Sequence, residues 1–120
     1  MKKILIVDDE PNIVMSLEYT FKKNNFEVFI ARDGQEALDI LKNALPDIII
    51  LDVMMPNVDG YNTLEQIKSD VRLEHTKVIF LSAKNKEKDI ERGLALGADL
   101  YMTKPFSVKK LVEQVNEIIK

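Results

Sequence analysis

Five short apolar runs, separated by longer segments of mixed character, constrain the fold of this chain more than any other feature. The runs lie at residues 4–7, 28–31, 48–51, 78–81 and 100–102. Most are rich in isoleucine and valine and do not alternate with polar residues, a pattern typical of strands that are buried on both faces. Their shortness, and the polar residues that follow them, favour strands over buried helical turns.

The segments between the runs carry apolar residues at helical spacing. Pro11 suits a first helical position, and Ser107 is a natural N-cap for the last helix. Ile90 and Leu94 form a shorter stripe that ends at Gly97, where a glycine suits a helix end. The other expected helical faces are Ile13, Val14, Leu17 and Phe21; Ala37, Leu38 and Leu41; Leu64 and Ile67; and Val108, Leu111, Val112, Val115, Ile118 and Ile119. Strands that alternate with single helices predict an α/β doubly wound fold, with a parallel sheet covered on both faces.

Composition narrows the class of protein. The chain has 120 residues, 46% of them hydrophobic and 31% charged, which fits one soluble globular domain over residues 1–120. It contains no cysteine, which excludes disulfides, thiolate metal sites and a cysteine nucleophile. The net charge is −3 and no run of Lys and Arg occurs, so we expect no direct nucleic-acid binding by this domain.

The apolar runs are also too short for targeting or membrane insertion. The first run resembles the start of a signal peptide, but it stops at Asp8 and Asp9. A secretory core needs at least about 7 apolar residues and a membrane span about 18. We therefore expect a cytoplasmic protein without membrane contact.

Polar side chains follow four of the five expected strands. Asp8 and Asp9 come after the first, Asp52 after the third, Ser82 ends the fourth, and Lys104 follows the fifth. Open parallel sheets bind their ligands outside the carboxyl ends of the strands, where these side chains would gather. The sequence therefore predicts a site at this edge of the sheet.

The residue types at this edge suit phosphoryl transfer. Three clustered carboxylates need raised pKa values or a cation, and oxygen ligands without His or Cys suit Mg²⁺. Lys104 would add a mobile positive charge and Ser82 a hydroxyl donor. A carboxylate nucleophile can then accept a phosphoryl group by positioning and charge neutralisation alone. Asp52 is the best nucleophile candidate, because it stands alone after the most central of the expected strands.

Each of these residues also has a simpler interpretation. Asp8 and Asp9 could cap a helix, Asp52 could be a turn residue, and a lone Lys104 is most often a solvated surface residue. Ser82 alone carries no information. Only their joint placement after four different strands favours a functional site.

With these residues in place, the chain resembles the receiver domains of two-component response regulators, and the resemblance extends from Lys3 to Lys120. The matching stretches are residues 4–11 (ILIVDDEP), residues 47–56 (DIIILDVMMP) with Asp59 and Gly60, residues 81–83 (LSA) and residues 97–106 (GADLYMTKPF). Any one of them would be weak evidence. Their common order and spacing make the resemblance specific.

The resemblance implies a flavodoxin-like sheet of strand order 2-1-3-4-5, with Asp52 as the phosphoacceptor. The implied Mg²⁺ ligands are Asp8, Asp9, Asp52 and the backbone carbonyl of Met54. Ser82 is similar to the switch hydroxyl that moves to the phosphoryl group, and Tyr101 to the aromatic residue that turns inward after it. Lys104 would bind a phosphoryl oxygen, and the Lys104–Pro105 bond would be cis.

A receiver of this kind works as a phosphorylation-activated signalling switch rather than as a metabolic enzyme. It would catalyse its own phosphorylation from a sensor histidine kinase or phosphotransfer protein, and also its own dephosphorylation. By the same resemblance, Met54 and Lys84 occupy positions that tune dephosphorylation in the family. Neither offers an acid or an amide to orient the attacking water, so we expect slow hydrolysis. The domain is expected to act alone or as an excised part of a longer regulator, as a monomer or a phosphorylation-dependent dimer.

Three rival functions are weighed against this one. A phosphorylation-independent interaction module with the same fold is the main alternative, although such proteins usually lose one of the acids, the hydroxyl or the lysine. A phosphatase of the haloacid-dehalogenase type would need a second aspartate where Met54 stands. A nucleotide-binding domain would need a glycine-rich phosphate loop, and no such loop follows any of the expected strands.

Overall fold

The five apolar runs form one five-stranded parallel sheet in a computed structural model that describes residues 1–56 and 58–120. The strand order is β2-β1-β3-β4-β5, as the resemblance implied, and the fold is flavodoxin-like. The strands are β1 (Lys2–Val7), β2 (Phe26–Ala31), β3 (Ile48–Leu51), β4 (Lys77–Ser82) and β5 (Leu100–Thr103). Each expected run lies within one strand.

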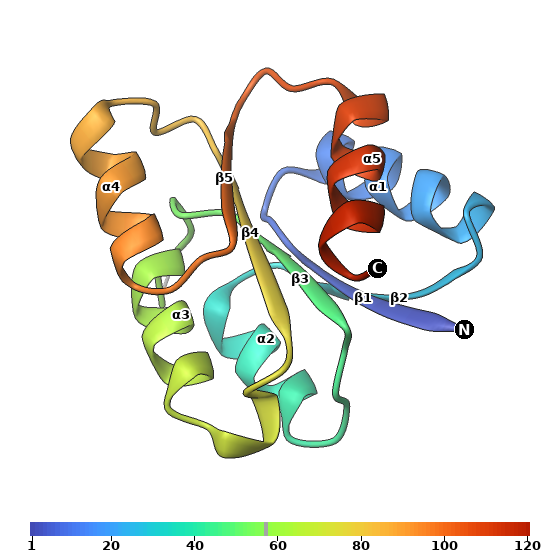
Figure 1. Ribbon diagram of the computed structural model, residues 1–120, viewed down its shortest axis with the longest axis horizontal. Coiled ribbons are helices and arrows are strands. Elements are labelled where there is room, and N and C mark those ends of the chain that lie inside the picture. Colours follow the sequence, from blue (N-terminus) through green and yellow to red (C-terminus); the bar gives the residue numbers. More distant parts are fainter. Residues whose placement is uncertain (57) are drawn as a thin grey trace.

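Helices cover both faces of the sheet (Figure 1). The helices are α1 (Pro11–Lys23), α2 (Gly34–Leu41), α3 (Gly60–Lys68), α4 (Glu87–Ala95) and α5 (Val108–Ile118), and a short 3-10 helix, η1 (Val71–Leu73), precedes β4. α1 and α5 lie on one face, and α2, α3 and α4 on the other. Among the described residues, no helix is long and apolar enough to cross a membrane.

The core consists of two layers, one on each face of the sheet. Ile4 and Ile6 of β1 pack in the layer below α1 and α5, whereas Leu5 and Val7 pack in the layer below α2 and α3. Successive strand residues point to opposite faces, so a strand that is buried on both faces reads as an uninterrupted apolar run. This explains why the first, third and fourth runs do not alternate.

The predicted helix signals hold at both ends of the chain. Pro11 is the first residue of α1. The Ser107 hydroxyl caps α5 by accepting a hydrogen bond from the backbone N–H of Lys110 at 3.2 Å. α4 ends just before Gly97, whose φ of +112° is a left-handed conformation that favours glycine.

The prediction that Leu94 lies on the buried apolar face of α4 is wrong. Leu94 is 45% exposed, and Gly93 is the residue of α4 that is buried. The aromatic rings of Phe80 and Tyr101 already fill the space below the helix, and a Cβ atom at Gly93 would lie 2.9 Å from each ring. α4 therefore approaches the sheet through a glycine, which the spacing of Ile90 and Leu94 did not indicate.

Candidate functional site

The expected polar residues do gather at the carboxyl edge of the sheet. Val7 pairs with Leu51 across β1 and β3, so that Asp8 and Asp52 leave the sheet side by side. The carboxylate of Asp52 lies beside the Lys104 ammonium, which arrives from the end of β5 on the far side of β4. Residues more than 90 positions apart in the chain thus meet at one point.

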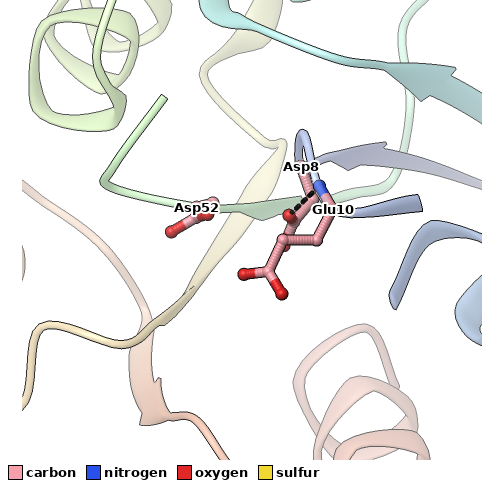
Figure 2. A group of neighbouring side chains, drawn as sticks. All are labelled: Asp8, Glu10 and Asp52. Carbon is pink, nitrogen blue, oxygen red and sulfur yellow. Dashed lines mark hydrogen bonds between the residues drawn. The ribbon is translucent and has the colours of Figure 1, made fainter. Parts of the chain in front are cut away.

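Three carboxylates form the centre of the site (Figure 2). One oxygen from each of Asp8, Glu10 and Asp52 lies within 4.8 Å of the others. Asp8 and Asp52 are buried, whereas the Glu10 side chain is 55% exposed. Asp9, which the sequence placed among the metal ligands, is exposed and does not belong to this group of oxygens. Glu10, which the sequence interpretation missed, belongs to it.

Lys104 holds the three acids together. Its Nζ lies 2.9 Å from Asp8 Oδ2, 2.8 Å from Glu10 Oε1 and 3.4 Å from Asp52 Oδ2. The side chain is only 10% exposed. Burial lowers the pKa of Lys104, but hydrogen bonds to Glu10 and Asp8 outweigh it, so the net pKa is raised and the ammonium stays charged. The Lys104–Pro105 peptide bond is cis, as expected.

Both buried carboxyls have raised pKa values. Burial is the largest cause for Asp52, and the charge of Asp8 adds to it, while Lys104 acts in the opposite direction. Burial also raises the pKa of Asp8, opposed by the hydrogen bond from the backbone N–H of Glu10 and by Lys104. The ionised site is therefore electrostatically unfavourable without a further cation.

Backbone donors fix the orientation of the two buried acids. The N–H of Met54 donates to Asp52 Oδ1 at 3.2 Å, and the N–H of Glu10 donates to Asp8 Oδ1 at 2.9 Å, the dashed line of Figure 2. The start of α3 packs tightly behind Asp52, because a Cβ atom at Gly60 would lie 2.2 Å from the carbonyl oxygen of Asp52. Only a glycine fits at this position.

Ser82 and Tyr101 connect the site to α4. The Ser82 hydroxyl is fully buried, accepts a hydrogen bond from the N–H of Lys84 at 3.2 Å, and acts to lower the pKa of Asp52. The Tyr101 hydroxyl donates to the carbonyl of the same Lys84 at 2.7 Å. The two predicted switch residues therefore share one loop residue between β4 and α4.

An aromatic cluster below α4 packs against Tyr101 and was missed by the sequence interpretation. The Phe80 ring lies 5.7 Å from both the Tyr61 and the Tyr101 rings, and the Arg92 guanidinium lies 4.1 Å above Tyr61. Burial raises the pKa of Tyr101 to about 12. Single aromatic residues in separate segments of the sequence give no signal that their rings will pack together.

The donor set suits a hard divalent cation. All three side chains offer carboxylate oxygens, the ligand type that Mg²⁺ prefers. Their mutual repulsion, opposed by one shared ammonium, leaves negative charge that a cation would neutralise. An open pocket of about 410 Å³ adjoins the site and is lined in part by Asp9 and Met54, so that a small anionic reactant has room to approach.

A flavodoxin-like fold with acids and a lysine at the carboxyl edge of its sheet is typical of a receiver domain. The chain belongs to the response regulator receiver domain family, whose sequence model matches residues 4–116. It is 42% identical over 119 residues to the alkaline phosphatase synthesis transcriptional regulatory protein PhoP of Bacillus subtilis (strain 168), covering 99% of this chain and 49% of that protein. The chain thus spans about half the length of this relative.

Solved structures agree with this assignment. The receiver domain of the Francisella response regulator 1452 is 34% identical, with a TM-score of 0.91 and coverage of 99% of this chain and 97% of that one. The chemotaxis response regulator CheY4 of Vibrio cholerae is 30% identical, with a TM-score of 0.92 and 98% of each chain covered. The chain is similar to both along nearly its whole length.

Proposed function

We propose that Asp52 accepts a phosphoryl group and that the resulting change at Ser82 and Tyr101 signals to a partner. One observation carries the proposal. A buried carboxylate at the end of a central strand lies 3.4 Å from a lysine that is itself only 10% exposed and that also binds a second buried acid. This arrangement is costly to fold and has an evident use in binding a phosphoryl group.

The chemistry requires one nucleophile and charge neutralisation. An oxygen of the Asp52 carboxylate attacks phosphorus and forms a new P–O bond, while the bond from phosphorus to the donor breaks and the donor keeps the electron pair. With a phosphohistidine donor the P–N bond breaks and the imidazole nitrogen leaves; with acetyl phosphate, acetate leaves. Lys104 would donate to a phosphoryl oxygen, and the Met54 N–H keeps Asp52 oriented.

Mg²⁺ fits the acidic group. Asp8 and Asp52 would hold the ion, with Asp9 and the backbone carbonyl of Met54 as the further ligands implied by the family resemblance. When bound, the ion supplies positive charge against the phosphoryl oxygens. The raised pKa values of Asp8 and Asp52 support this assignment, because a cation would relieve the cost of ionising both groups.

Ser82 and Tyr101 would transmit the modification to α4. The phosphoryl group adds about 1.5 to 2 negative charges and three acceptor oxygens beside the Ser82 hydroxyl. Ser82 now accepts from the Lys84 N–H, and Tyr101 donates to the Lys84 carbonyl. If the hydroxyl turns to the phosphoryl group, the Lys84 loop loses one contact and Tyr101 can move with it, which shifts a two-state equilibrium.

Hydrolysis of the acyl phosphate would be slow. Met54 is 56% exposed above the site and Lys84 is half-buried at its rim. Neither side chain can accept a proton from an attacking water or orient it by an amide. A phosphoryl lifetime of seconds would contradict this expectation.

The family assignment supports a proposal for the biological setting. We propose that residues 1–120 form one receiver domain and that the donor is a sensor histidine kinase or phosphotransfer protein in the cytoplasm. The relative PhoP is a transcriptional regulatory protein of which this chain covers 49%, so the signal would pass to a DNA-binding output domain rather than act through nucleic-acid contact by the receiver itself. A phosphorylation-dependent dimer would fit such an output.

Intact mass spectrometry tests the proposal. The protein is incubated with acetyl phosphate, with and without Mg²⁺, as wild type, Asp52→Asn and the control Asp39→Asn, which alters an exposed aspartate of α2 that pairs with Lys42. We expect one phosphoryl adduct that requires both Mg²⁺ and Asp52 and that persists in the control. Absence of the adduct from wild type, with acetyl phosphate and with a histidine kinase donor alike, would favour the alternative, an interaction module that does not depend on phosphorylation.

A further inference from the structure

Glu10 makes the shortest of the three contacts with Lys104. Its Oε1 lies 2.8 Å from Nζ, compared with 2.9 Å for Asp8 and 3.4 Å for Asp52. The Lys104 side chain is 10% exposed, whereas that of Glu10 is 55% exposed. The contact therefore joins a held cation to the one carboxylate of the group that is free to move into solvent.

The backbone and the side chain of Glu10 are held differently. Its N–H is fixed to Asp8 Oδ1 at 2.9 Å. It is also the N-cap residue of α1. Among the described contacts its side chain does not cap that helix but accepts a hydrogen bond from Lys104. Because the backbone of Glu10 is held and its side chain is exposed, the carboxylate can leave Lys104 without a change in the fold.

We propose that Glu10 is an internal placeholder for the phosphoryl group. Its carboxylate occupies a hydrogen-bonding position on Lys104 in the unmodified protein and leaves when a phosphoryl oxygen arrives. This rests on the function proposed for Asp52 and names Glu10 as a positioning residue for that reaction. Glu10 would thus set how readily the site accepts the phosphoryl group, because it must first give up Lys104.

The replacement of Glu10 by a phosphoryl oxygen at Lys104 costs little, because the Glu10 carboxylate is also stabilised where it stands in the chain. It stands at the N-terminus of α1, where the positive end of the helix dipole stabilises a negative charge. Lys104 in turn exchanges a singly charged carboxylate for a phosphoryl group with about 1.5 to 2 charges. The exchange should therefore run toward the modified state once a donor is bound.

Two substitutions separate this role from simple charge repulsion. Glu10→Gln removes the charge, whereas Glu10→Asp keeps the charge on a side chain that is one methylene shorter and is expected not to reach Lys104 at hydrogen-bonding distance. If Glu10 acts as a placeholder, both variants should accept the phosphoryl group faster. If its charge merely repels the donor, only Glu10→Gln should.

The experiment compares the full chain as wild type, Glu10→Gln, Glu10→Asp and the control Glu18→Gln. Glu18 lies on the same helix and pairs with the exposed Lys22 at 2.9 Å, away from the site. At saturating Mg²⁺ and with acetyl phosphate, we expect both Glu10 variants to be phosphorylated about two- to fivefold faster, the range that the loss of a partly exposed ion pair implies. The rate of phosphoryl loss should stay at the wild-type value, because Glu10 no longer holds Lys104 in the modified state.

A binding measurement gives a readout without chemistry. Beryllofluoride mimics the phosphoryl group, and its affinity in the presence of Mg²⁺ can be followed by ¹⁹F NMR. We expect both Glu10 variants to bind it about two- to fivefold more tightly, and the Glu18 control to bind it as wild type does.

Several outcomes would overturn the inference. Wild-type rates and affinities in Glu10→Asp would leave charge repulsion as the whole effect. Loss of Mg²⁺ affinity by about tenfold or more in Glu10→Gln would make Glu10 part of the metal site instead. If wild type forms no adduct and binds no beryllofluoride, the function proposed for Asp52 is itself wrong. If wild type reacts and the Glu10 variants react at the same rate, only the role proposed for Glu10 is wrong.

Discussion

Replacing Asp52 by Asn should stabilise the metal-free protein, even though it removes the proposed reactive group. Asp52 is buried at 4% exposure beside two other acids. The asparagine keeps a similar shape and one acceptor oxygen for the Met54 N–H. It lacks the negative charge, whose burial beside Asp8 destabilises the folded protein.

The distances give the magnitude. At an effective dielectric of about 20, an acid at the 4.8 Å limit repels Asp52 by about 3.5 kcal/mol, and Lys104 at 3.4 Å attracts it by about 5 kcal/mol. Asp8 exerts this repulsion fully, whereas solvent weakens that of the exposed Glu10. Attraction and repulsion therefore nearly cancel, and the cost of burying the carboxylate remains. Lys104 keeps Asp8 and Glu10 as partners after the substitution, so that its charge is not left uncompensated. We therefore expect Asn to raise the free energy of unfolding by about 1–2 kcal/mol, the lower part of the gain of about 1–4 kcal/mol known for replacing buried ionic groups by neutral ones.

The gain should depend on pH in a defined direction. The pKa of Asp52 is raised above its ordinary value of 3.8 by burial and by Asp8. The native state therefore binds this proton more readily than the unfolded chain, and stability falls as the pH rises from the ordinary value through the raised one. Above that window the penalty is complete, so Asp52→Asn gains most near neutral pH and gains little near pH 4.

Urea denaturation in EDTA provides the assay. Midpoints and slopes are measured for wild type, Asp52→Asn and the exposed control Asp39→Asn between about pH 4 and pH 8. A gain of 1 kcal/mol corresponds to about 4 °C in melting temperature for a domain of this size. An Asp52→Asn variant that is as stable as wild type or less stable at neutral pH, or a gain that grows on acidification, would refute the reasoning.

Three further predictions concern the same edge of the sheet. Mg²⁺ should stabilise wild type by mass action, by about 2.7 kcal/mol at a hundred times its dissociation constant, and so raise its melting temperature. It should stabilise Asp52→Asn much less, and equal shifts in melting temperature would argue against a site at this acid. Gly60→Ala should lose about 2 kcal/mol or more, because its Cβ would lie 2.2 Å from the Asp52 carbonyl oxygen, and thermal denaturation by circular dichroism that shows no loss would contradict the tight contact. Tyr101→Phe should abolish the tyrosine ionisation near pH 12 in an ultraviolet absorbance titration, and persistence of that step would assign it to another tyrosine.

The fold could be predicted from the sequence because its determinants are local or periodic. A strand that is buried on both faces must be apolar at every position, so that β3 is recognisable from residues 48–51 alone. Alternation with helical segments then leaves a parallel sheet as the arrangement that buries them all. The buried face of α4 could not be predicted in this way. Its contact with Phe80 and Tyr101 depends on Gly93, and a glycine gives no hydrophobic signal in the sequence.

The side chains that leave the ends of strands could be placed from the sequence, whereas those in the connection between β1 and α1 could not. Asp8, Asp52 and Lys104 follow their strands directly, so topology alone brings them together. Asp9 and Glu10 lie beyond the strand, where one residue more or less changes the direction of a side chain. In the structure the Glu10 side chain reaches Lys104 and belongs to the acidic group, whereas the Asp9 side chain is exposed and does not. The sequence of residues 8–11 does not indicate which of the two side chains takes this position.

The unfavourable charge balance of the unmodified site would explain the response that we propose for it. A site whose charges were fully satisfied would gain little from a metal ion or a phosphoryl group, since a ligand can shift an equilibrium only by its differential affinity for the two states. Here one ammonium serves three carboxylates, two of them buried with raised pKa values. A bound cation would relieve the repulsion, and a phosphoryl group on Asp52 would offer Lys104 a stronger partner than Glu10. The stabilisation predicted for Asp52→Asn would thus measure the cost of the crowded carboxylates, whereas the faster reaction predicted for both Glu10→Gln and Glu10→Asp would measure the competition for Lys104.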